Sequence, residues 1–123
     1  MTKHVLIADD EPNIVISLEF LMRREGHRVS VARDGDAALA AIRSERPDLV
    51  LLDVMMPGRS GMEVCQAVRE DPALAGVKIL MLSAKGRDTD LAKGTALGAD
   101  AYVTKPFSTR ELADKVRELL AGA

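Results

Sequence analysis

Two hydrophobic periods alternate along the whole chain, and this alternation limits the fold more than any other feature of the sequence. Short apolar or alternating segments typical of β-strands are each followed by a segment with apolar residues at helical spacing. The strand-like segments are 4–8, 28–32, 48–53, 78–84 and 101–105, and the helix-like segments are about 14–25, 34–46, 62–70, 88–97 and 108–120. This repeat predicts an α/β fold, in which a parallel sheet of five strands has helices on both faces.

The composition of the strands predicts their order in the sheet. The first, third and fourth are apolar at nearly every position, so we expect them in the centre with both faces buried. The second, RVSVA, and the fifth, AYVTK, carry polar residues at alternate positions and suit the two edges. The doubly wound order 2-1-3-4-5 meets both conditions. A sheet of this order binds ligands beyond its carboxyl edge, where strands 1 and 3 diverge.

The overall composition excludes several classes of protein. The 123 residues suffice for a single domain, 1–123, and a net charge of −2 argues against unaided binding to nucleic acid. Cys65 is the only cysteine, so we expect no disulfide within the chain, no multi-thiolate metal site and a reducing, cytoplasmic location. No apolar run approaches the roughly 18 residues of a membrane span, and no apolar leader opens the chain.

Charged and polar side chains stand at the ends of four predicted strands. Asp9 and Asp10 follow the first strand, Asp53 ends the third, Ser83 lies near the end of the fourth, and Lys105 ends the fifth. Because the carboxyl ends of parallel strands meet at one edge of the sheet, we expect these side chains to converge. Oxygen ligands without a histidine or cysteine cluster favour a hard cation, Mg2+ before Ca2+.

Three carboxylates, a hydroxyl, an ammonium group and a hard cation form a set suited to phosphoryl transfer. The cation and Lys105 would neutralise charge on the phosphoryl oxygens, and Ser83 would donate a hydrogen bond to them. A carboxylate can also act as the nucleophile and carry an acyl phosphate. Asp53 is the best candidate, because it leads into the loop-like segment MMPGRSG, whereas Asp9 and Asp10 are placed as metal ligands.

The stretches VLIADDEP, PDLVLLDVMMPGRSGMEVC, ILMLSAK and GADAYVTKPF resemble, in this order and spacing, the receiver domains of two-component response regulators. The likeness covers essentially the whole chain and implies a flavodoxin-like, CheY-like fold. It implies a signalling phosphoacceptor rather than an enzyme, one that catalyses only its own Mg2+-dependent phosphorylation and dephosphorylation. The phosphoryl donor would be a histidine kinase or a phosphotransfer protein. The surface of the fourth helix, fifth strand and fifth helix would then change its affinity for a downstream protein.

The resemblance also implies which residues hold the metal and the phosphoryl group. Asp53 would be the phosphoacceptor. Asp10, Asp53 and the main-chain carbonyl of Met55 would hold Mg2+, with Asp9 contributing through water. Mn2+ could replace Mg2+, and phosphorylation could drive formation of a homodimer.

Further residues would report the phosphorylated state. The resemblance implies that Ser83 and Lys105 bind the phosphoryl oxygens, and that Tyr102 changes its rotamer as space opens behind Ser83. It also implies a cis peptide bond between Lys105 and Pro106.

Alternative functions stay open for the same residues. A degenerate receiver-like module that only binds partners would lack one of the five key residues, and none is missing here. A phosphatase with an aspartyl nucleophile would usually have a second acid two positions later, where this chain has Met55. The sequence contains no DNA-binding segment, so we expect a freestanding regulator or a part of a longer one.

Overall fold

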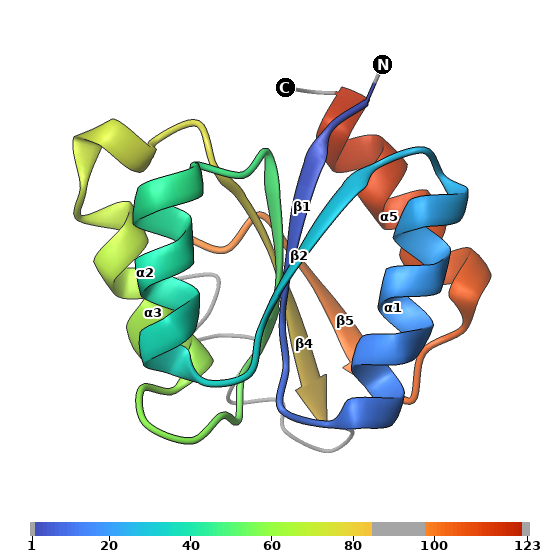
Figure 1. Ribbon diagram of the computed structural model, residues 1–123, viewed down its shortest axis with the longest axis horizontal. Coiled ribbons are helices and arrows are strands. Elements are labelled where there is room, and N and C mark those ends of the chain that lie inside the picture. Colours follow the sequence, from blue (N-terminus) through green and yellow to red (C-terminus); the bar gives the residue numbers. More distant parts are fainter. Residues whose placement is uncertain (1, 85–97, 122–123) are drawn as a thin grey trace.

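Five apolar or alternating segments form one parallel sheet. In the computed structural model, which describes residues 2–84 and 98–121, the strands are β1 (His4–Ala8), β2 (Arg28–Ala32), β3 (Leu49–Asp53), β4 (Lys78–Ala84) and β5 (Ala101–Lys105). Their order is β2-β1-β3-β4-β5, and all neighbouring strands are parallel (Figure 1). The fold class and the strand order expected from the sequence are confirmed.

Helices cover both faces of this sheet. Within the described residues they are α1 (Pro12–Arg24), α2 (Gly35–Glu45), α3 (Gly61–Arg69) and α5 (Thr109–Ala121), and a 3-10 turn, η1, lies at Pro72–Leu74. Helices α1 and α5 lie on one face and α2 and α3 on the other (Figure 1). The helix expected at about 88–97 lies outside the described residues. None of the helices in the described ranges has the length and apolar content needed to cross a bilayer.

Each face of the sheet has its own hydrophobic core, because successive strand side chains point to opposite faces. Side chains that pack toward α1 and α5 include Ile7, Leu51, Leu82 and Val103, and those that pack toward α2 and α3 include Leu6, Val50, Met81 and Tyr102. By the same alternation, Asp53 and Lys105 continue the rows on the α1 and α5 side. Ser83 continues the row of Met81 on the α2 and α3 side.

Side-chain caps fix the starts of α2 and α3, and a left-handed residue follows the end of α2. Asp34 accepts a hydrogen bond from the Ala37 N–H at 2.7 Å before α2, and α2 ends at Arg46 in the left-handed conformation with φ 47°. Ser60 and Glu63 form a complete capping box at the start of α3. These caps determine where the loops that flank β3 begin and end.

A second capping sequence lies at the start of α5. The Ser108 hydroxyl accepts the N–H of Glu111 at 3.0 Å. Ser60 and Glu63 follow the same sequence pattern, a serine followed three residues later by a glutamate.

Candidate functional site

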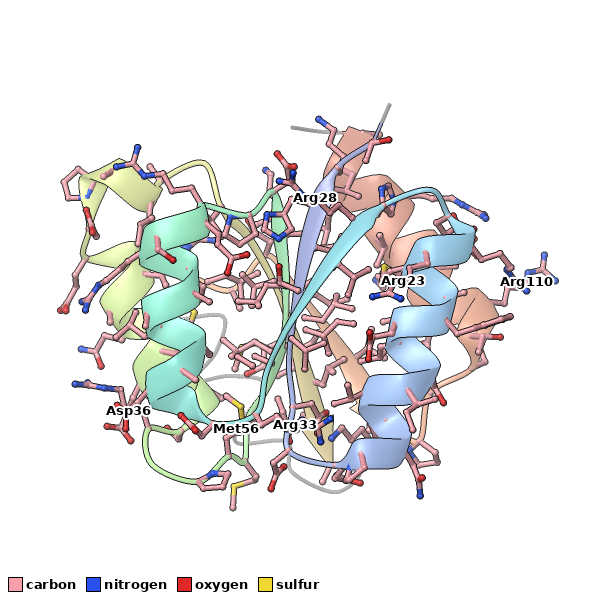
Figure 2. The ribbon with its side chains drawn as sticks, in the orientation of Figure 1. Arg23, Arg28, Arg33, Asp36, Met56 and Arg110 are labelled. Atoms are coloured by element: carbon pink, nitrogen blue, oxygen red, sulfur yellow. The ribbon has the colours of Figure 1, made fainter. Side chains whose placement is uncertain are left out.

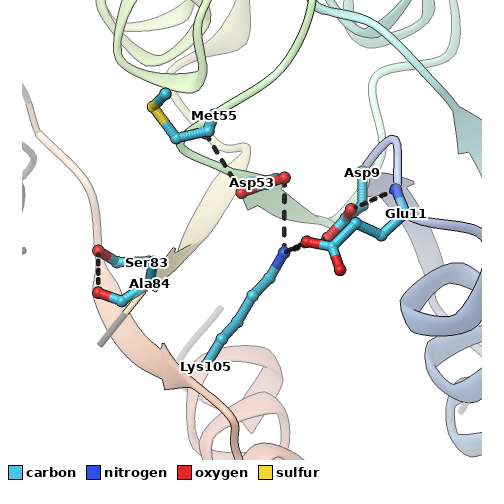
Figure 3. A network of polar contacts seen from close by, with 7 residues as sticks. All are labelled: Asp9, Glu11, Asp53, Met55, Ser83, Ala84 and Lys105. Atoms are coloured by element: carbon cyan, nitrogen blue, oxygen red, sulfur yellow. Dashed lines mark hydrogen bonds and ion pairs between the residues drawn. The ribbon is translucent and has the colours of Figure 1, made fainter. Parts of the chain in front are cut away.

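The carboxylates of Asp9, Asp10 and Asp53 meet at the carboxyl edge of the sheet. Figure 3 shows two of them, Asp9 and Asp53, with the ammonium group of Lys105. One oxygen each from Asp9, Asp10 and Asp53 all lie within 4.8 Å of one another. Lys105 Nζ lies 2.9 Å from Asp9 Oδ2 and 3.5 Å from Asp53 Oδ2. Strand β4 lies between β3 and β5, so the long side chain of Lys105 must reach across it. The fold therefore brings together four of the five residues that the sequence places at strand ends.

The two neighbouring aspartates of the cluster differ in environment. Asp9 is fully buried, and both of its oxygens are occupied: Oδ1 accepts the Glu11 N–H at 2.9 Å, and Oδ2 pairs with Lys105. Asp10 is exposed to solvent. Asp9 therefore anchors Lys105 inside the site, while Asp10 presents its carboxylate at the open side, where a cation can reach it.

Burial dominates the electrostatics of Asp53, whose residue is 5% exposed. Loss of solvation, with repulsion from Asp9 second, raises the pKa of its carboxyl from 3.8 to about 6, and the charge of Lys105 opposes this rise. The Met55 N–H donates to Asp53 Oδ1 at 3.2 Å and favours the ionised form. The ionised carboxylate of Asp53 is therefore destabilised by burial, even with the ammonium group of Lys105 beside it.

Lys105 is held in its charged form by the surrounding acids. Burial alone would lower the pKa of its ammonium group, but the hydrogen bond to Asp9 and the charges of Asp53 and Asp9 raise it. One positive charge nevertheless faces several carboxylates. A hard divalent cation with oxygen ligands suits this excess of negative charge.

The hydroxyl of Ser83 does not join the cluster. It donates to the Ala84 carbonyl at 3.4 Å, and it lies apart from the pair of Asp53 and Lys105 in Figure 3. The register explains this, because Asp53 pairs with Leu82, and Ser83 belongs to the next row, toward α2 and α3. No hydrogen bond links Ser83 to Asp53 or Lys105 in the part of the chain that the structure describes.

Comparison with known families decides what kind of domain carries this site. The profile of the response regulator receiver domain family matches residues 5–117, which is nearly the whole chain. The chain belongs to this family. It is a receiver domain of response regulators in two-component signalling, as its sequence motifs led us to expect.

Solved structures agree with this assignment. A candidate response regulator of Chloroflexus aurantiacus J-10-fl is 36% identical with a TM-score of 0.93, over 98% of this chain and 99% of that one. The chemotaxis response regulator CheY4 of Vibrio cholerae is 31% identical with a TM-score of 0.90, over 98% and 100%. NtrX of Brucella abortus is 29% identical with a TM-score of 0.88, over 99% of this chain but 27% of NtrX. This receiver domain is thus similar to a whole chain in two cases and to part of a longer one in the third.

Tyr102, expected to change rotamer, packs in the receiver domain against α3. Its side chain is half-buried in the core on the α2 and α3 side, with its hydroxyl 3.9 Å from Met62 Sδ. Tyr102 and Ser83 therefore belong to the same face of the sheet. The Lys105–Pro106 peptide bond is cis. The rotamer change itself stays a prediction, and the fourth helix of the expected partner surface lies outside the described residues.

Glu11 is a member of the site to which the sequence analysis gave no role. Its Oε1 lies 3.1 Å from Lys105 Nζ, on the solvent side of the buried pair with Asp9. The signal was present in the three consecutive acids of DDE. Glu11 lies in the turn between β1 and α1, so the alternation of strand side chains does not predict where it points. The geometry of the turn directs its carboxylate toward Lys105.

Proposed function

We propose that this receiver domain accepts a phosphoryl group on Asp53 in a Mg2+-dependent reaction and thereby changes its affinity for a protein partner. The observation that carries the proposal is the environment of one carboxylate. Asp53 is nearly buried, lies 3.5 Å from the ammonium of Lys105, and has an oxygen within 4.8 Å of oxygens of Asp9 and Asp10. Such a carboxylate can attack phosphorus while positive charge gathers around the phosphoryl oxygens.

The residues divide the chemistry between them. An Asp53 oxygen forms a bond to phosphorus as the bond from phosphorus to the donor breaks, and the leaving group departs with the bonding electrons. Asp10, Asp53 and the main-chain carbonyl of Met55 would hold Mg2+, with Asp9 acting through water. When bound, Mg2+ or Mn2+ supplies positive charge to the phosphoryl oxygens. The domain would catalyse only its own phosphorylation and dephosphorylation, and would not act as an enzyme on other substrates.

Phosphorylation would then rearrange the contacts of Lys105 and Ser83. The new phosphoryl oxygens compete for Lys105 with Glu11, whose side chain is largely exposed and whose ion pair is therefore weak. The Ser83 hydroxyl would leave a long hydrogen bond of 3.4 Å for a charged acceptor, which binds more strongly. Tyr102 lies in the row of Ser83 and could enter the space that the hydroxyl vacates.

Receiver domains interact with histidine kinases and with downstream effectors. For this chain, a histidine kinase or a phosphotransfer protein would supply the phosphoryl group. The surface of the fourth helix, β5 and α5 would bind the downstream partner, or a second copy of the chain. A shift of this kind requires a partner that binds one of the two states more tightly.

The test is labelling with a small acyl phosphate, followed by mass spectrometry of the intact chain. The wild type should gain one phosphoryl group with Mg2+ and none with a chelator, and Asp53→Ala should gain none. A matched control is Asp114→Ala, which removes an exposed carboxylate of α5 and should label as the wild type does. Labelling of Asp53→Ala, or labelling without a divalent cation, would contradict the proposal.

A further inference from the structure

The loop that follows the proposed phosphoacceptor, residues 54–60, is packed against the first turn of α2. The Gly35 N–H donates to the Pro57 carbonyl at 3.1 Å. A Cβ atom at Gly35 would overlap the carbonyl oxygen of Arg59 and lie 2.6 Å from its carbonyl carbon. The backbone of the loop therefore lies directly on the backbone of α2, at a position where only glycine leaves enough room.

Asp36 extends this contact beyond the glycine. Its Oδ1 lies 2.8 Å from Arg59 Nε, and its Oδ2 lies 3.0 Å from the place a Cβ of Gly58 would occupy. Gly58 has φ +71°, which is the left-handed conformation that glycine adopts without strain. Figure 2 shows Asp36 at the end of α2 that is nearest to this loop. The carboxylate thus covers the turn of the loop and pairs with the residue that follows it.

The beginning of the loop is fixed by separate contacts. The Val54 N–H donates to the Leu82 carbonyl at 3.0 Å, and the Gly61 N–H donates to the Val54 carbonyl at 2.9 Å. A Cβ at Gly61 would overlap the Asp53 carbonyl oxygen and lie 2.9 Å from the Asp53 carbonyl carbon. Met55 therefore lies between two fixed parts of the loop. The start of the loop is held by β4 and α3, and its turn is held by α2.

We propose that Gly35 and Asp36 are positioning residues for the cation site, because they hold the loop that carries the main-chain carbonyl of Met55. The inference rests on the proposed function, in which that carbonyl is a ligand of Mg2+. Helix α2 has no other part in the site. The exposed ion pair of Asp36 and Arg59 is weak by itself, so most of the positioning comes from the close backbone contact at Gly35.

Replacement of a single glycine tests the backbone contact. Gly35→Ala adds a methyl group that forces the loop away from α2, whereas Gly76→Ala places the same group where no atom lies within 4 Å. We expect Gly35→Ala to raise the dissociation constant for Mg2+ about tenfold by titration calorimetry, and Gly76→Ala to leave it within about twofold. Urea unfolding in a chelator shows whether each variant is folded. If Gly35 had a purely structural role, Gly35→Ala would lower the free energy of unfolding but leave the affinity for Mg2+ unchanged.

Charge exchange tests the contact of Asp36 without threatening the fold, since both partners are exposed. Asp36→Ala should weaken Mg2+ binding about twofold to threefold. The double variant Asp36→Arg with Arg59→Asp should recover the wild-type value, because it restores the pair and keeps the net charge. Wild-type affinity in both folded Gly35→Ala and Asp36→Ala overturns the inference and leaves the proposed function standing. A wild-type protein that does not bind Mg2+ overturns both.

Discussion

The two ends of the sheet hold their polar side chains in opposite ways. At the amino end, His4 Nε2 lies 2.7 Å from Ser30 Oγ and 3.1 Å from Glu45 Oε1, and Ser30 donates to Glu45 at 2.7 Å. Asp48 accepts the His4 N–H at 2.8 Å, which joins the starts of β1 and β3. Among the buried side-chain atoms that the structure describes, His4 Nδ1 lacks a partner, and the other polar groups named here are paired with one another.

At the carboxyl end, by contrast, several acids share one base in the cluster that the described residues form. Asp9, Glu11 and Asp53 share the single ammonium of Lys105, and Asp10 lies beside them. Burial first, and repulsion from Asp9 second, oppose the ionisation of Asp53 and raise its pKa to about 6. Among the described residues, the polar groups at the amino end are thus largely paired with one another, whereas those at the carboxyl end keep an excess of negative charge around Lys105. The second arrangement is the one suited to the cation of the proposed function.

Removal of the ammonium group of Lys105 should cause the largest loss of stability. Lys105→Met leaves Asp9 and Asp53 buried without their counter-charge, so we expect a loss of about 3 kcal/mol in the free energy of unfolding. The measurement is urea denaturation at pH 7 in a chelator. Lys78→Met, at the amino end of β4, is the matched control and should change stability by less than about 0.5 kcal/mol. Equal losses in the two variants would mean that the acids do not depend on Lys105.

Addition of the missing positive charge should stabilise the same end. At one hundred times its dissociation constant, Mg2+ should raise the free energy of unfolding by about 2.7 kcal/mol, which thermal unfolding reports as a higher Tm. Asp10→Asn should match the wild type without metal, because Asp10 is exposed, and should lose the response to Mg2+. An undiminished response in Asp10→Asn would remove this residue from the cation site.

Neutralisation of Asp53 should stabilise the metal-free protein in a pH-dependent way. The folded pKa of about 6 exceeds the unfolded value of 3.8, so the folded state binds the proton more tightly and loses stability as the pH rises through this interval. Asp53→Asn avoids that loss and should be more stable by about 2 kcal/mol above pH 6. The gain should vanish as the pH falls toward 4. The measurement is urea denaturation across this pH range in a chelator. A gain in stability of Asp53→Asn that did not change with pH would contradict the raised pKa of Asp53.

A change at the amino end should have the smallest effect. Ser30→Ala removes the hydroxyl between His4 and Glu45 and should cost about 1 kcal/mol in the free energy of unfolding. Its increase in Tm with Mg2+ should equal that of the wild type, because the two networks lie at opposite ends of the strands. A smaller response to Mg2+ would instead show that the two ends are coupled.

The sequence was sufficient for the sheet because hydrophobic periodicity determines which segments are strands. The bounds predicted for β1, β2, β4 and β5 are those in the structure, and β3 begins one residue later than predicted. The convergence of Asp9, Asp10, Asp53 and Lys105 was predictable for a related reason, since every parallel strand carries its last residue to the same edge.

The contacts that could not be predicted depend on local geometry instead. The turn after β1 directs Glu11 to Lys105, and the row to which Ser83 belongs keeps its hydroxyl away from Asp53. Glu45, the last residue of α2, contacts Ser30 and His4 across the edge of the sheet. To predict each of these contacts, one must know where a second helix, strand or turn lies. The residue pattern within a single segment does not contain that information.

The separation of the site residues along the chain has a consequence for biosynthesis. Asp9 and Lys105 are 96 positions apart, and Lys105 comes from the last strand to be made. A nascent polypeptide therefore cannot assemble the acidic cluster with its counter-ion until the ribosome has released nearly all of the domain. Unfinished or truncated chains that lack Lys105 would accordingly have no complete site for the proposed phosphorylation.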